Sequence, residues 1–147
     1  MLKPTKILVP TDFSEHSDKA LKQALDIAKQ YGAEVYLLNV VIPLPQCVVD
    51  YCLPEMALLE IEKKAKQSAL ENLQNELDKF PLSREVKVIA DVKFGLPYEE
   101  ILKEADNMGI DLIVIASLGQ SGMAKYFIGS VARNVLKSAM CPVLLTK

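Results

Sequence analysis

The stretch DLIVIA, residues 111–116, is the most apolar segment of the chain, and it decides the fold. Only its leading aspartate is polar, so a strand formed here would be apolar on both faces, which is typical of a parallel sheet covered by helices. Similar apolar runs lie at residues 6–10 and 35–41. We therefore expect a central strand at residues 111–116, in a sheet that also contains the other two runs.

Helix-like and strand-like segments alternate along the rest of the chain. Helical spacing of apolar residues predicts helices at about 15–31, 55–80, 97–108 and 130–139. Two further strands are expected, at residues 85–92 and 141–146. This alternation predicts a single α/β domain over residues 1–147: an open five-stranded parallel sheet with helices on both faces, Rossmann-like, in the order 3-2-1-4-5.

Two segments carry further expectations. Residues 42–54 contain three prolines and are expected to be an irregular loop. In the helix predicted at 55–80, the Glu and Lys residues opposite the apolar stripe are interpreted as solvated.

Composition excludes several classes of protein. Lys and Arg number 17 and Asp and Glu 19, a balance that argues against a basic nucleic-acid-binding surface. No apolar run approaches the ~20 residues that cross a bilayer, and none resembles a signal peptide, so we expect a cytoplasmic protein without membrane partners. Cys47, Cys52 and Cys141 lack metal-ligand spacing and are expected to be reduced thiols.

Ligands of an open parallel sheet bind beyond the carboxyl ends of the strands, where the strand order reverses. The loop after residue 116 holds half of the six glycines, which let the backbone approach a ligand and point its N–H groups toward it. Gly129 and Ser130 then open a helix whose first turn favours an anion such as phosphate. The alternative is a loop that needs glycines only for its turns, with Ser130 as a helix cap.

Asp12 follows the first strand directly. A carboxylate is costly to bury unpaired, so it does not serve the core. It either caps the following helix, which this residue alone favours, or accepts hydrogen bonds from a sugar hydroxyl or a base amine of a ligand.

Five motifs occur in one order along the chain: ILVPTDFS (7–14), GLPYEEI (95–101), GIDLIV (109–114), GSVARNVL (129–136) and CPVLL (141–145). Their combination resembles the universal stress protein family over essentially the whole length. In the ATP-binding branch of that family a glycine is followed after two residues by a second, and after nine more by Gly-Ser or Gly-Thr. Gly119, Gly129 and Ser130 match the second part of this pattern, and Ala116 occupies the position of the first glycine.

The resemblance implies an adenine nucleotide, ATP or AMP, with or without Mg²⁺, as a regulatory ligand in a stress response. It implies that the adenosine half of the site is lined by Pro10, Thr11, Asp12 and Val40. It implies that the ribose and phosphate half is lined by Ile115, Ala116, Gly119, Gly129, Ser130 and Val131. It also implies a homodimer, paired through the last strand at Pro142–Thr146, whose apolar sheet edge invites a second copy.

Two other functions remain open at this point. Ala116 favours an interaction protein of the same fold that binds no nucleotide. A slow ATPase is the third possibility, although the sequence shows no catalytic set: there are no paired carboxylates, no Ser-His-Asp arrangement and no lysine-bearing phosphate loop.

Overall fold

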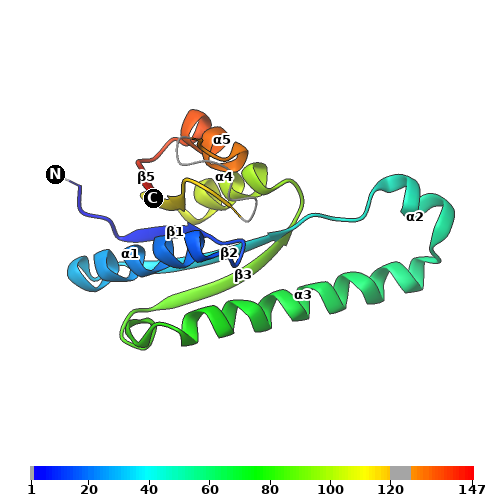
Figure 1. Cartoon of the computed structure of the whole chain (residues 1–147), viewed down its shortest axis with the longest axis horizontal. Coiled ribbons are helices and arrows are strands. Elements are labelled where there is room, and N and C mark those ends of the chain that lie inside the picture. The colour runs from blue at the N-terminus through cyan, green and yellow to red at the C-terminus, as the bar shows by residue number, and fades with distance from the viewer. Residues whose placement is uncertain (1, 120–126) are drawn as a thin grey trace.

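Five parallel strands and their connecting helices make up the computed structural model, which describes residues 2–119 and 127–147 (Figure 1). The strands are β1 (Lys6–Pro10), β2 (Glu34–Val41), β3 (Val88–Phe94), β4 (Leu112–Ala116) and β5 (Val143–Thr146). The helices are α1 (Glu15–Tyr31), α2 (Gln46–Cys52), α3 (Glu55–Asp78), the 3-10 helix η1 (Pro81–Arg84), α4 (Pro97–Met108) and α5 (Ser130–Ser138).

The sheet has the order β3-β2-β1-β4-β5 and every pair in it is parallel, as predicted. β1 lies at the centre, with Leu8 opposite Tyr36 of β2 on one side and Ile113 of β4 on the other. The chain builds outward from β1 to β3 and then returns to β4. The strand order therefore reverses between β1 and β4, and this is where a ligand site is expected.

Alternate strand residues fill two apolar layers, one on each face of the sheet. Ile7 and Val9 of β1 join the layer beneath α1 and α3, whereas Leu8 joins the layer beneath α4 and α5. Figure 1 shows α3 on one side of the sheet and α4 and α5 on the other. The central strands are therefore covered on both faces, which explains why their sequences are apolar throughout.

Local signals set the helix ends. The Ser14 side chain caps α1 by accepting a hydrogen bond from the Ser17 backbone N–H (3.2 Å), and the helix ends at Gly32 in the left-handed region (φ 69°). Pro97 occupies the first turn of α4, which ends at Gly109 (φ 64°). These features agree with the sequence patterns.

Two predictions about the middle of the chain are wrong. Residues 42–54 are not wholly irregular, because α2 begins directly after Pro45. The strand expected at 85–92 lies at Val88–Phe94, because Pro81 starts the short helix η1 before it. The alternating pattern located this strand but not its limits.

Helix α3 is divided between packed and unpacked halves. Its later residues Ala69, Leu73 and Leu77 are buried against the sheet. Its first turns and α2 extend past the end of the sheet (Figure 1), and Met56 and Tyr51 there are 79% and 88% exposed. Within the described residues, no helix combines the length and apolarity needed to cross a membrane.

Candidate functional site

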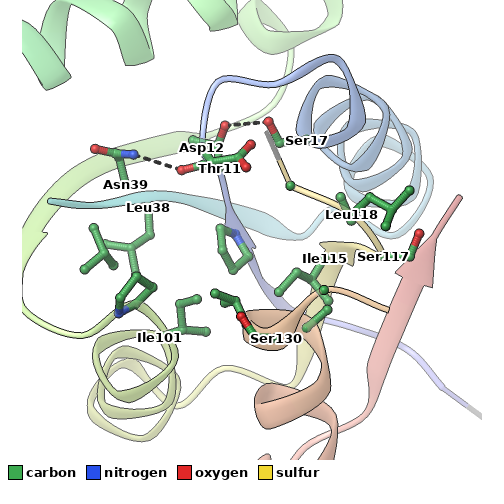
Figure 2. A pocket seen from close by; sticks show the side chains of 18 residues that line it. Thr11, Asp12, Ser17, Leu38, Asn39, Ile101, Ile115, Ser117, Leu118 and Ser130 are labelled. Atoms are coloured by element: carbon green, nitrogen blue, oxygen red, sulfur yellow. Dashed lines mark hydrogen bonds between the residues drawn. The ribbon is translucent and has the colours of Figure 1, made fainter. Parts of the chain in front are cut away.

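A pocket of about 290 Å³ lies beyond the carboxyl ends of β1, β2 and β4, against the start of α5 (Figure 2). Its size is near the lower end of the roughly 300–1,000 Å³ typical of small-molecule sites. The residues proposed from the sequence all line it: Pro10, Thr11, Asp12, Val40, Ile115, Ala116, Gly119, Gly129, Ser130 and Val131. Sequence reasoning missed the other lining residues: Ser17, Leu38, Asn39, Pro97, Ile101, Ser117, Leu118 and Ala132.

The walls of the pocket are mainly apolar. Leu38 comes from β2 and Ile115 from the end of β4, and Ile101 comes from α4 on the facing side (Figure 2). Ala116, the last residue of β4, pairs with Thr146 of β5, and its methyl group leaves the pocket open. Among the described lining residues, Asp12 alone carries a charged side chain. The pocket therefore suits a flat apolar group with a few polar contacts.

Thr11 is fixed in the wall by backbone hydrogen bonds to β2. Its N–H donates to the carbonyl oxygen of Leu38 (2.9 Å), and its carbonyl oxygen accepts from Nδ2 of Asn39 (2.9 Å; Figure 2). Asn39 is the one polar residue within the apolar run 35–41, and this contact explains its presence there. The turn after β1 is thus held to the neighbouring strand.

The side chain of Thr11 is held from the opposite direction by Glu76 of α3. The Thr11 Oγ1 lies 2.9 Å from both carboxyl oxygens of Glu76 and 3.0 Å from the Ser17 hydroxyl. Glu76 is only 2% exposed, so the expectation that the glutamates of α3 are solvated is wrong at this position. Glu76 lies between the buried residues Leu73 and Leu77, on the face that packs against the sheet.

The environment of Glu76 changes its acidity. The pKa of its carboxyl is raised from 4.5 to about 7. Burial is the largest cause and the nearby Asp18 carboxyl acts in the same direction, while the Thr11 hydroxyl and Lys79 act in the opposite direction. Lys79 forms an ion pair with Asp18 (2.8 Å) and so neutralises one of the two carboxyls. Glu76 therefore titrates near neutral pH, next to the wall of the pocket.

Asp12 lines the pocket but does not cap α1. Its Oδ1 accepts a hydrogen bond from the Ser14 backbone N–H (3.1 Å), and Phe13 between them has a positive φ of 64°. A Cβ atom built on Gly119 would lie 2.7 Å from Oδ2 of Asp12. The loops after β1 and β4 therefore approach each other so closely that a side chain at position 119 would displace the Asp12 carboxylate.

The start of α5 forms the opposite wall. Gly129, and not Ser130, is the N-cap residue, and no side chain among the described residues caps this helix. The first-turn N–H groups of Ser130, Val131 and Ala132 have no acceptor within the helix. The Gly129 N–H itself donates to the Ser117 carbonyl oxygen (2.7 Å), so the expectation that this amide points into the pocket is wrong. Residues 120–126, including Gly122 of the predicted glycine loop, lie outside the described residues.

Comparisons with known proteins agree with this fold. The family model "Universal stress protein family" matches residues 4–147. Universal stress protein MJ0531 of Methanocaldococcus jannaschii is 35% identical over 97% of this chain and 81% of its own length. The solved structure of hypothetical protein MJ0577 is 32% identical, with a TM-score of 0.83 over 99% of this chain and 97% of that one.

Two more distant structures share the fold and contain nucleotides. A universal stress protein in complex with cAMP is 20% identical, with a TM-score of 0.71 over 98% of this chain and 97% of that one. The universal stress protein of Archaeoglobus fulgidus in complex with dAMP is 21% identical, with a TM-score of 0.61 over 99% of this chain and 100% of that one. The match over nearly the whole length, together with the strand order, places this chain in the universal stress protein family.

Proposed function

We propose that this protein binds an adenine nucleotide in the pocket between β1 and β4 and uses it as a regulatory ligand. One observation carries the proposal: apolar strand ends face the same pocket as the start of α5, which has no side-chain cap among the described residues. An apolar wall suits the face of a purine, and free N–H groups at a helix start suit a phosphate. The pocket thus offers both kinds of contact that a nucleotide requires.

The ligand's expected orientation follows from these walls. The adenosine lies against Pro10, Thr11 and Val40, and the phosphate lies at Ser130 and Val131. Asp12, between the two walls, accepts hydrogen bonds from the ribose hydroxyls. The complexes of two proteins of this fold with cAMP and dAMP support an adenine nucleotide as the ligand class.

A divalent cation would enter together with the nucleotide. The described residues include no group of three His, Cys, Asp or Glu side chains that could hold a metal ion. Mg²⁺ is commonly bound by substrate phosphates with one or two carboxylates, and Asp12 could supply one. We therefore propose that Mg²⁺, where present, is held mainly by an ATP ligand.

Calorimetric titration with AMP, ADP and ATP, with and without Mg²⁺, tests the proposal. We expect saturable binding that weakens in Asp12→Ala by about 1–3 kcal/mol, the contribution of a hydrogen-bonded carboxylate. Gly129→Val should also weaken binding, because its side chain crowds the start of α5. The matched control is Asp26→Ala, an exposed carboxylate on α1, which should bind as wild type does. Absence of saturable binding at millimolar nucleotide would contradict the proposal.

We also propose a homodimer paired through β5. This strand lies at the edge of the sheet, and β4 is its one neighbour in the described structure. The carbonyl groups of Pro142 and Thr146 accept hydrogen bonds from the β4 side, so the backbone groups of Val143 and Leu145 face outward. Sedimentation equilibrium should give twice the mass of one chain, and a single-chain mass at tens of micromolar would contradict a stable dimer.

A further inference from the structure

Behind the Thr11 wall lies a cluster of polar side chains that nucleotide contacts alone do not explain. It consists of Thr11 after β1, Ser17 and Asp18 on α1, Glu76 on α3, and Lys79 at the C-cap of α3. Thr11, Ser17 and Glu76 are all buried, although burying a polar group is costly unless its hydrogen bonds are made. The stability of this cluster therefore depends on which atom holds each of its protons.

The hydroxyl protons are limited in number. The Ser17 hydroxyl donates to the Ser14 carbonyl oxygen (2.9 Å), and Thr11 Oγ1 accepts from the Phe13 backbone N–H (3.0 Å). The one proton on Thr11 Oγ1 can therefore go to the Glu76 carboxylate or to the Ser17 oxygen, but not to both. Glu76 can accept this proton in either of its ionisation states, because a carboxylic acid that donates through one oxygen can still accept at the other.

Asp18 shows where a proton on Glu76 would be used. Its Oδ2 accepts from Lys79 (2.8 Å), whereas its Oδ1 is buried with no hydrogen-bond partner among the described residues. Glu76 is close to this part of α1, because Thr11 Oγ1 lies 2.9 Å from Glu76 and 3.0 Å from Ser17, the residue next to Asp18. The Asp18 carboxyl also raises the pKa of Glu76. Two ionised carboxylates cannot bond to each other, but a protonated Glu76 supplies the donor that Asp18 Oδ1 lacks.

We propose that Glu76 is a positioning residue: a proton shared between Glu76 and Asp18 holds the Thr11 wall in place, and loss of that proton weakens nucleotide binding. With the proton in place, the negative charge of Asp18 is balanced by Lys79. Without it, the buried carboxylate of Glu76 and the partly exposed carboxylate of Asp18 share one ammonium group and repel each other between α1 and α3. Glu15 on α1 also acts on Lys79, whose pKa its negative charge raises. Because Glu15 is itself an acid, it does not neutralise the charge of Glu76 or Asp18.

The direction of the pH effect follows from this charge balance. Burial raises the pKa of Glu76 to about 7, so the shared proton is present in weakly acidic solution and is lost as the pH rises through neutrality. Nucleotide affinity should fall over the same range. This inference rests on the proposed nucleotide site, but the state of the shared proton can be measured in the protein without nucleotide.

The first experiment therefore omits the ligand. Urea denaturation midpoints are measured from pH 5.5 to 8.5 for wild type, Glu76→Gln and the control Glu71→Gln, an exposed glutamate on the same helix. We expect the midpoints of wild type and Glu71→Gln to fall in parallel with rising pH. Glu76→Gln, which keeps a hydrogen-bond donor at all pH values, should show a much flatter profile. In a third variant, Asp18→Asn, the negative charge that raises the pKa of Glu76 is removed. The decrease of the urea midpoint should therefore occur at lower pH than in wild type. If the urea midpoints of wild type and Glu76→Gln changed in parallel with pH, the proposal of a shared proton would be overturned.

The second experiment adds AMP and measures its dissociation constant over the same pH range. Comparison of variants at each pH cancels the titration of the phosphate group of AMP itself. We expect the dissociation constant of wild type to rise about fivefold to tenfold relative to that of Glu76→Gln between pH 6 and 8.5. A constant ratio would overturn the positioning role. Failure of all variants to bind AMP at any pH would refute the nucleotide site, while the urea profiles would still test the proton pair.

Discussion

Helices α1 and α5 both begin at the pocket, yet their first turns are built in opposite ways. The start of α1 is closed by its own side chains, since Ser14 accepts from the Ser17 N–H and Ser17 bonds back to the Ser14 carbonyl. The start of α5 has Gly129 at its N-cap and no side-chain cap among the described residues. A closed first turn has fewer donors left for a ligand, whereas an open one offers them.

The two walls also differ in what holds them. The α1 wall depends on Glu76, which is 65 residues from Thr11 in the sequence and belongs to a helix on the outer layer. The α5 wall is held by a local contact, the Gly129 N–H to the Ser117 carbonyl oxygen. From this difference we propose a division of roles, in which the α1 wall is fixed from within and shapes the pocket, and the α5 wall binds the anion. Substitutions at each wall can test this division.

Adding a side-chain cap to the α5 wall should have the largest effect on nucleotide affinity. Gly129→Asp places a carboxylate at the N-cap of α5, where the backbone (φ −58°, ψ 155°) already has a conformation suited to a capping residue. We expect nucleotide affinity to fall about 100-fold, or roughly 2.7 kcal/mol, because the side chain competes with phosphate for the same N–H groups. Calorimetry measures the affinity, and thermal unfolding measures the stability. The stability should stay equal or increase. Unchanged affinity in a folded variant would argue against an anion at α5.

Two glycines of the open wall should respond differently to alanine. Gly119→Ala places a Cβ atom 2.7 Å from Oδ2 of Asp12, so the carboxylate must turn aside. This variant should lower the free energy of unfolding by up to about 1 kcal/mol and weaken nucleotide binding. Gly129→Ala places its Cβ 3.5 Å from the Ser117 carbonyl oxygen, an ordinary contact, and should leave the stability equal or raise it by up to about 1 kcal/mol. Urea denaturation of both variants measures the difference. Equal stabilities would contradict the close approach of Asp12 to residue 119.

Glu76, which holds the α1 wall, should make the free energy of unfolding depend on pH. The pKa of Glu76 is about 7 in the folded protein and 4.5 as its ordinary value, so between these values the folded state binds more protons than the unfolded state. The free energy of unfolding contributed by Glu76 is therefore greatest below pH 4.5 and decreases as the pH rises to about 7, by roughly 1–3 kcal/mol. Denaturation at pH 5 and pH 8 measures this change. If wild type, relative to Glu76→Gln, were more stable at pH 8 than at pH 5, the raised pKa of Glu76 would be contradicted.

Removing the cap of α1 should have the smallest effect on function. Ser14→Ala eliminates the hydrogen bond to the Ser17 N–H and should cost about 1 kcal/mol of stability. Nucleotide affinity should change by less than about twofold, because Ser14 does not line the pocket. Thermal unfolding and calorimetry on one sample measure both effects. Loss of affinity comparable to that of Gly129→Asp would show that the two walls do not have separate roles.

The sequence predicted the architecture well, because the sheet depends on local patterns. Apolar runs defined the strands, and their alternation with helices led to the observed strand order. The motifs at Asp12, Gly119 and Gly129 also located the pocket, since loops at the carboxyl ends of parallel strands converge.

Other features depend on contacts between distant segments and could not be predicted. The burial of Glu76 depends on the rotation of α3 against the sheet, which brings this residue to Thr11 rather than to solvent. The use of the Gly129 N–H within the protein depends on the path of the chain at Ser117. The stripe from Leu58 to Phe80 predicted a helix, but the sheet is too short to cover its first turns.

The division between the walls is tested most directly by NMR titration of the ¹⁵N-labelled protein with AMP. Saturable shifts of the Ser130, Val131 and Ala132 amide signals, much smaller with adenosine and accompanied by little change at the Ser17 amide, are the predicted result. Saturable binding of AMP that leaves the three α5 amides unmoved, or that moves the Ser17 amide instead, would contradict the assignment of the anion to α5.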